Sequence, residues 1–120
     1  MNKVNLKKVL ILSCSVLSFN INAHSLGNND VMAKQCQDLA ETVASLVSSQ
    51  AKSTCAEKLG LASIQLEKAG NLILDSAYLT AKDALSNAIF TLQYAELNIC
   101  NRYIQISHSK IEAQKIKNSL

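Results

Sequence analysis

Four cysteines and two histidines are the residues of this sequence most able to bind a metal, act as a nucleophile or form a cross-link. A nucleophile needs a base beside it, and a structural zinc ion needs four converging ligands. The sequence contains no C-x-x-C or H-x-x-x-H spacing, no G-x-G-x-x-G and no P-loop, and its acidic residues are spread singly. His108 lies in Ser107-His108-Ser109, which is typical of a solvated helix end. We therefore expect no catalytic, metal or cofactor-binding site and no enzymatic activity.

The N-terminal segment has the three parts of a secretory signal peptide. Three lysines stand among the first eight residues, an apolar run extends from Val9 to Phe19, and Ala23 offers a small residue for cleavage. Eleven apolar residues are too few for a permanent membrane-spanning helix, which needs about 20. We expect residues 1–23 to be removed and the protein to be exported, to the periplasm or the medium. A lipoprotein signal with Cys14 as the acceptor is the weaker alternative.

Cleavage after Ala23 would change the charge balance of the chain. It removes three of the twelve basic residues and none of the nine acidic ones, which leaves nine of each. A neutral exported protein has no overall attraction for nucleic acid, so we expect no nucleic-acid partner. Four of the remaining basic residues lie between Arg102 and Leu120 beside Glu112 alone, so the C-terminus is locally basic.

The rest of the chain has the periodicity of α-helices. Of its 120 residues 48% are apolar, and it has three glycines and no proline, which excludes most all-β folds. Apolar positions recur every three or four residues in two stretches, from Cys36 to Ala69 and from Leu74 to Ile106. Gly70-Asn71 between them is typical of a helix end. The sequence predicts an all-α fold, a long antiparallel helical hairpin that turns at residues 70–71.

A break within the first stretch is the alternative. Residues 48–54 are polar, and Thr54-Cys55-Ala56-Glu57 has the spacing of a capping box at a helix start. A break there predicts a three-helix bundle with helices near 30–50, 54–69 and 72–107. The apolar spacing continues through the segment without glycine or proline, so we favour the unbroken helix.

Three cysteines in an oxidising compartment allow one internal disulfide. In a hairpin that turns at residue 70, residue i lies opposite about residue 140 − i, so Cys36 faces about residue 104 and Cys55 faces about residue 85. Cys36 is then about 6 Å along the helix from the level of Cys100. The hairpin predicts a Cys36–Cys100 disulfide and a free thiol at Cys55. The alternative is that Cys36 stays unpaired as a small buried apolar residue.

The second helical stretch carries more apolar residues than one neighbouring helix can cover. A line through Phe90, Leu97 and Ile104 lies beside the predicted core positions, and Tyr94 adjoins it. Exposed apolar surface of this kind marks an interaction site. We expect Phe90, Tyr94, Leu97 and Ile104 to bind a protein partner or a second copy of the chain.

The expected organisation has four parts: a signal peptide (1–23), a flexible lead-in (24–29), a helical domain (30–108) and a basic C-terminal tail (109–120). Two other functions follow from these parts. The tail could make weak membrane contact, with Ile111 and Ile116 facing lipid beside Lys115 and Lys117. A small ligand could alternatively be carried between the helices.

Overall fold

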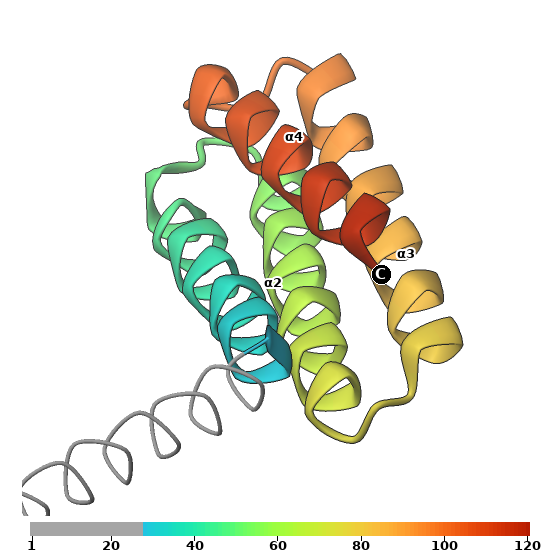
Figure 1. Cartoon of the computed structure of the whole chain (residues 1–120). Helices are drawn as coiled ribbons and strands as arrows, with labels where there is room; N and C mark the ends of the chain where they lie inside the picture. Colours follow the sequence, from blue (N-terminus) through green and yellow to red (C-terminus); the bar gives the residue numbers. More distant parts are fainter. Residues whose placement is uncertain (1–27) are drawn as a thin grey trace, which may run out of the picture.

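The computed structural model describes residues 28–120, which form four helices connected in sequence (Figure 1). A first helix covers residues 28–45 within this range and is followed by a short 3₁₀ helix, η1 (Val47–Ser49). The other helices are α2 (Ser53–Leu74), α3 (Tyr78–Leu97) and α4 (Tyr103–Ser119). Successive helices are antiparallel neighbours: the 28–45 helix lies beside α2, α2 beside α3, and α4 folds back along α3 (Figure 1). The expected signal peptide (1–23), its cleavage point at Ala23 and residues 24–27 lie outside the described residues.

The predicted all-α class is confirmed, since the described part of the chain is helical and has no strand. The single long hairpin is wrong. The chain turns three times among the described residues, at 46–52, 75–77 and 98–102, where the hairpin required one turn at 70–71. The three-helix alternative predicted a break near residues 46–52 but not the turn at residues 98–102.

The first break lies where the polar segment suggested it. After residue 45 the chain passes through η1, and Gln50 takes an extended backbone (φ −85°, ψ 130°) before α2 begins. No capping box forms here: the residue that precedes α2 is Lys52, and it makes no side-chain capping bond. The preference for an unbroken first helix was therefore wrong, because polarity of the segment outweighed the continuity of its apolar spacing.

Gly70 and Asn71 lie inside α2, where they end no helix. Gly70 is buried against the 28–45 helix, and a Cβ atom built on it would lie 3.0 Å from the Ala33 carbonyl oxygen and 3.3 Å from Cys36 Cβ. The glycine therefore permits the close approach of two helices. A glycine that serves packing and one that ends a helix look alike in a sequence, and this explains the misplaced turn.

The two real turns around α3 are built without glycine. Ser76 (φ 59°) and Ile99 (φ 53°) both take the left-handed conformation directly after a helix. At the first turn Ala77 N–H donates to the Leu72 carbonyl and Ser76 N–H to the Ile73 carbonyl; Cys100 and Ile99 repeat this pattern at the second turn. Both are Schellman motifs, which usually place glycine at the left-handed position. A β-branched isoleucine is unusual there, so the residue type at position 99 does not predict a turn.

In the core, α2 and α3 each contribute a line of large aliphatic side chains, and alanines occupy the other contact positions. Leu59, Leu66 and Ile73 of α2 are fully buried, as are Leu85 and Leu92 of α3. Alanines at the remaining contact positions allow close helix packing: Ala33, Ala40, Ala62, Ala69, Ala81, Ala84, Ala88, Ala95 and Ala113. Ile106 connects α4 to the same core. The exposed larger side chains are therefore left on the outer faces.

Cys55 and Cys100 form the disulfide, with their Cα atoms 5.7 Å apart, and Cys36 is a buried free thiol. The expected Cys36–Cys100 pairing and the expected free thiol at Cys55 are both wrong. The error follows from the turn: α2 and α3 are joined at residues 75–77, so residue i of α2 faces about residue 152 − i. Cys55 then faces about residue 97, close to Cys100. Cys36 fits the alternative in which it fills the core as a small apolar residue.

The disulfide end of the bundle is also held by hydrogen bonds between two connections. Gln50 Nε2 donates to the Asn101 carbonyl (2.8 Å), and Asn101 Nδ2 donates to the Ser49 carbonyl (2.8 Å). Lys52 Nζ adds a bond to the Asn98 carbonyl. The opposite end is held by Asn29, which bonds Ser76 and Tyr78. Both ends of α3 are thus bonded to other parts of the chain.

Residues 109–120, the expected basic tail, form the last three turns of α4 and the final residue. Ser109, Ala113 and Ile116 are buried there. Ile116 therefore points into the protein, and Ile111 alone of the two isoleucines is exposed. Of the two isoleucines expected to face a membrane, only Ile111 is therefore available at the surface of the folded protein.

Candidate interaction surfaces

The outer side of α3 carries four large apolar side chains that are exposed to solvent. Leu79 is 79% exposed, Phe90 75%, Leu97 71% and Tyr94 39%. Leu79, Phe90 and Leu97 lie nearly in line along the helix, opposite the buried line that contains Ala88 and Leu92, and Tyr94 lies at the edge toward α2. We call these four residues the α3 face. Leu79, Phe90 and Leu97 are largely in solvent and lie outside the core, whereas Tyr94 is partly covered and has Lys58 of α2 over its ring.

Two side chains of α2, Gln65 and Lys58, contact α3 at the edge of the α3 face. Thr91 Oγ1 donates to Gln65 Oε1 (3.1 Å), and Lys58 Nζ lies 5.0 Å from the centre of the Tyr94 ring. These contacts set the register of α2 against α3. Leu61 lies within about 60° of Lys58 and Gln65 round α2 and is itself exposed, whereas Ile64 lies about 100° from Gln65, on the outward side of the helix. The apolar surface therefore extends from α3 to Leu61 of α2.

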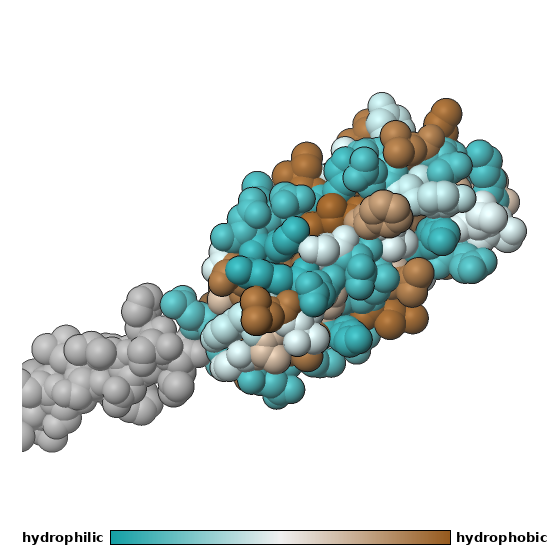
Figure 2. All heavy atoms as spheres, turned by 90° about the vertical axis from the view of Figure 1, so that its right-hand side faces the viewer, coloured by the Kyte–Doolittle hydropathy of each residue, from teal (hydrophilic) through white to brown (hydrophobic). Residues whose placement is uncertain are grey.

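A space-filling view onto the α3 side shows brown apolar groups interrupted by teal polar ones (Figure 2). Apolar atoms gather at the upper end of this view, where α3 turns into α4. Ile99 and Tyr103 belong to that end and are exposed, in addition to Leu97. The surface is mixed, with apolar patches surrounded by polar residues, as at many protein interfaces.

All four residues expected from the sequence as interface candidates are exposed, but the structure does not bring them onto one surface. Phe90, Tyr94 and Leu97 belong to the α3 face, whereas Ile104 stands on α4 beyond the turn and lines a groove on another side. Sequence reasoning missed Leu79. The available signal was the position of Leu79 eighteen residues before Leu97, because eighteen residues are five helical turns and place both side chains on the same side of a helix.

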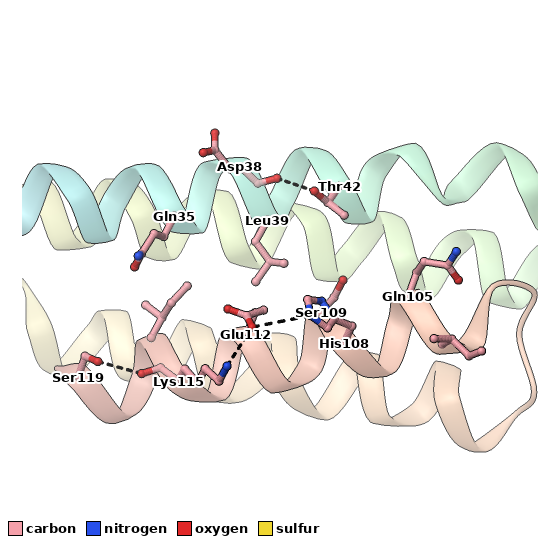
Figure 3. Close-up of a pocket in the computed structure, with 12 residues that line it drawn as sticks. Gln35, Asp38, Leu39, Thr42, Gln105, His108, Ser109, Glu112, Lys115 and Ser119 are labelled. Carbon is pink, nitrogen blue, oxygen red and sulfur yellow. Dashed lines mark hydrogen bonds and ion pairs between the residues drawn. The ribbon is translucent and has the colours of Figure 1, made fainter.

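A groove of about 680 Å³ separates the 28–45 helix from α4 (Figure 3). In Figure 3, Gln35 and Leu39 point from the first helix toward Glu112 and Ser109 of α4. Leu39, Ile116 and Ile104 supply its larger apolar side chains, and the remaining lining residues are polar: Gln35, Asp38, Thr42, Gln105, His108, Ser109, Glu112, Lys115 and Ser119. Its volume is within the range of small-molecule sites, which is about 300–1,000 Å³.

The charges at the groove are mostly paired with each other. Lys115 Nζ lies 3.2 Å from Glu112 Oε1, and His108 Nε2 lies 3.9 Å from the same oxygen. Asp38 pairs with Lys34 at 3.1 Å. Paired charges of both signs give the groove no strong preference for an anion or a cation.

Glu96 of α3 and Lys110 of α4 make the closest ion pair of the described residues, with 2.6 Å between Nζ and Oε1. Both side chains are about three-quarters buried. The hydrogen bond from Lys110, assisted by one from Ser107, lowers the pKa of the Glu96 carboxyl below its ordinary value. This pair fixes α4 on the side of α3 away from Tyr94, which leaves the α3 face open.

The structure describes one free thiol, Cys36, and one histidine, His108, in different surroundings. Cys36 is fully buried, and this burial raises the pKa of its thiol to about 11, so it stays protonated and unreactive. His108 is exposed on α4. No cluster of three or more metal-ligating side chains occurs among residues 28–120.

None of the helices in the described range is both long and apolar enough to span a membrane. Comparison with protein-family models, with curated proteins and with solved structures finds no match to this chain.

Proposed function

We propose that this chain is an exported, non-enzymatic helical protein that binds a protein partner, a different protein or a second copy of itself, through the α3 face. The observation that carries the proposal is the exposure of Leu79, Phe90 and Leu97 on one side of a helix fixed at both ends. Exposed apolar side chains lower the solubility of a protein unless a partner covers them. Aromatic residues at the centre of such a surface are typical of interface anchors.

Two features support export. The N-terminal segment has three lysines, an apolar run and Ala23 in the order of a signal peptide. The Cys55–Cys100 disulfide is of the kind that persists in oxidising compartments. The intact mass of the protein recovered from its own cells under non-reducing conditions tests this: we expect a chain that begins at His24 with one disulfide and one thiol. A chain that retains Met1, or a reduced one, would contradict export.

Site-specific photo-crosslinking in the producing cells tests the binding of a protein partner. A photoreactive amino acid at Gln93, an exposed position between Phe90 and Leu97, should give a discrete cross-linked product that mass spectrometry can identify. The same amino acid at Val31, which is exposed on the 28–45 helix on the far side of α2, is the matched control. Phe90→Asp should remove the Gln93 product while the helical circular dichroism is unchanged. Equal products from both positions, or none from Gln93, would refute the proposal.

The groove favours one second candidate, a carrier of a small molecule held between the 28–45 helix and α4. Its support is the 680 Å³ volume and the buried Ser109, a polar residue on the groove wall. Native mass spectrometry of protein purified without unfolding would detect a bound molecule as added mass. Gln105→Trp, which would fill the groove from α4, should abolish that mass; an unliganded mass for the unmodified protein would exclude this candidate.

A further inference from the structure

The outward residues of α3 follow the spacing of a helix–helix seam. Leu79, Asp83, Ser86, Phe90, Gln93 and Leu97 are separated alternately by four and three residues, which is the spacing of the core positions of a coiled coil. All six are exposed or half-buried, and none belongs to the core of the chain. A second helix could therefore pack along this entire line.

The sizes along this seam are self-complementary in the antiparallel direction. The six positions are symmetric about residue 88, so in an antiparallel pair residue i of one copy faces about residue 176 − i of the other. Leu79 then faces Leu97 at both ends, and Phe90 faces Ser86, whose small side chain leaves room for the ring. A parallel pair in register would instead place Asp83 against Asp83 and Phe90 against Phe90, which opposes like charges.

The charge of Asp83 in the seam and that of Lys58 beside it are complementary in the same arrangement. A two-fold axis places the same flank of both α3 helices together, and Asp83, Tyr94 and the α2 side all lie on one flank. Asp83 of one copy therefore approaches Tyr94 and Lys58 of the other. Neither Asp83 nor Lys58 has an ion-pair partner among residues 28–120, and Lys58 is held over the Tyr94 ring.

The available area is of the size that a dimer needs. Each partner of a standard interface buries about 800 Å². An aromatic side chain can bury about 150–250 Å². The exposed parts of Phe90, Leu79 and Leu97, with smaller shares from Tyr94 and the adjoining Leu61 of α2, supply apolar area of the same order on each copy.

We propose that the occupant of the α3 face is a second copy of this chain, bound as a two-fold symmetric dimer with antiparallel α3 helices centred near residue 88. This inference rests on the proposed function, because it names the partner of the same surface. It predicts that Phe90 lies near the dimer axis over Ser86 of the other copy, with Asp83 beside the partner's Lys58.

Sedimentation of the oxidised chain without its signal peptide, over a wide range of concentrations, tests the dimer. We expect a reversible dimer for the unmodified protein, and a dissociation constant raised by about thirtyfold or more in Phe90→Asp. Val31→Asp, an exposed apolar position on the 28–45 helix, should leave the dissociation constant unchanged. Asp83→Lys should weaken the dimer, and Lys58→Glu added to it should restore binding. A monomer at every concentration, or equal effects of Phe90→Asp and Val31→Asp, would overturn the dimer.

Cysteine cross-linking tests the register. In a Cys36→Ala background, chains with Asp83→Cys and chains with Gln93→Cys are mixed and oxidised, one of them isotopically labelled. The antiparallel register predicts mixed covalent dimers, because equivalent positions lie about 15 Å apart along the helix in the symmetric pair. Cross-links mainly between identical chains would overturn it. A monomeric protein whose Gln93 still cross-links to a different protein in cells would refute this dimer and leave the proposed function standing.

Discussion

Gly70 of α2 meets the backbone of the first helix at Ala33: a Cβ atom on the glycine would lie 3.0 Å from the Ala33 carbonyl oxygen. The other glycine of α2, Gly60, has nothing within 4 Å of the corresponding point. The two glycines of one helix therefore have different roles. At Gly70 the absence of a side chain sets the distance between two helices, whereas at Gly60 it only weakens the helix.

This contrast predicts opposite effects of the same substitution. Gly60→Ala should raise the free energy of unfolding by about 1 kcal/mol, which is the difference in helix propensity. Gly70→Ala gains the same propensity but forces a backbone carbonyl and Cys36 apart, and overpacking costs about 1–3 kcal/mol. We expect a net loss for Gly70→Ala of about 1 kcal/mol. Urea unfolding followed by circular dichroism measures both variants, and stabilisation by both would show that the 28–45 helix can move away.

The disulfide should contribute strongly to stability, because Cys55 and Cys100 are 45 residues apart in sequence. Closing a loop of this length restricts the unfolded chain and is expected to contribute about 4 kcal/mol. Cys55→Ser with Cys100→Ser should lower the free energy of unfolding by about that amount. Peptide mapping of the unmodified protein without reduction should recover residues 55 and 100 in one linked pair of peptides. A linked pair containing Cys36 would mean that the helices turn elsewhere.

Cys36 should make stability fall at alkaline pH. Burial raises the pKa of its thiol from 9.0 to about 11, so between these pH values the folded protein holds a proton that the unfolded chain releases. The stability linked to Cys36 is fully present below pH 9 and is lost as the pH rises toward 11. The free energy of unfolding of Cys36→Ala should therefore decline less over this interval than that of the unmodified protein. Parallel declines would show that the thiol is not buried.

The Glu96–Lys110 ion pair should make its contribution above mildly acidic pH. Its hydrogen bonds lower the pKa of the Glu96 carboxyl, so the stability it adds is present above the ordinary value of 4.5 and is lost as the pH falls through the lowered value. We expect Glu96→Gln to cost about 1 kcal/mol or less near pH 7 and progressively less as the pH falls below 4.5. Asp38→Asn, which removes a far more exposed pair with Lys34, is the control and should change stability less at neutral pH. Equal changes would assign no special role to the α3–α4 pair.

The spacing of apolar residues was sufficient to determine the helical class and most of the core. Positions on the predicted lines, such as Val43, Leu59, Leu85 and Ile106, are buried. The line fails where the chain turns: Ala51, Ile99 and Tyr103 fit the period but are exposed. Periodicity records which side of a helix is apolar, and it continues unchanged across a turn when the turning residues are themselves apolar or small.

The tertiary structure alone decided where the helices end, and with that the disulfide and the surface. Ser76 and Ile99 take left-handed conformations that their residue types disfavour, and Gly70 serves packing where a turn was expected. The cost of these conformations is met by contacts distant in sequence, such as the bonds between Gln50 and Asn101. The sequence also indicated an apolar excess around Phe90 and Leu97. Only the placement of α2 and α4 against the two sides of α3 determined that this excess, with Leu79, forms an exposed face.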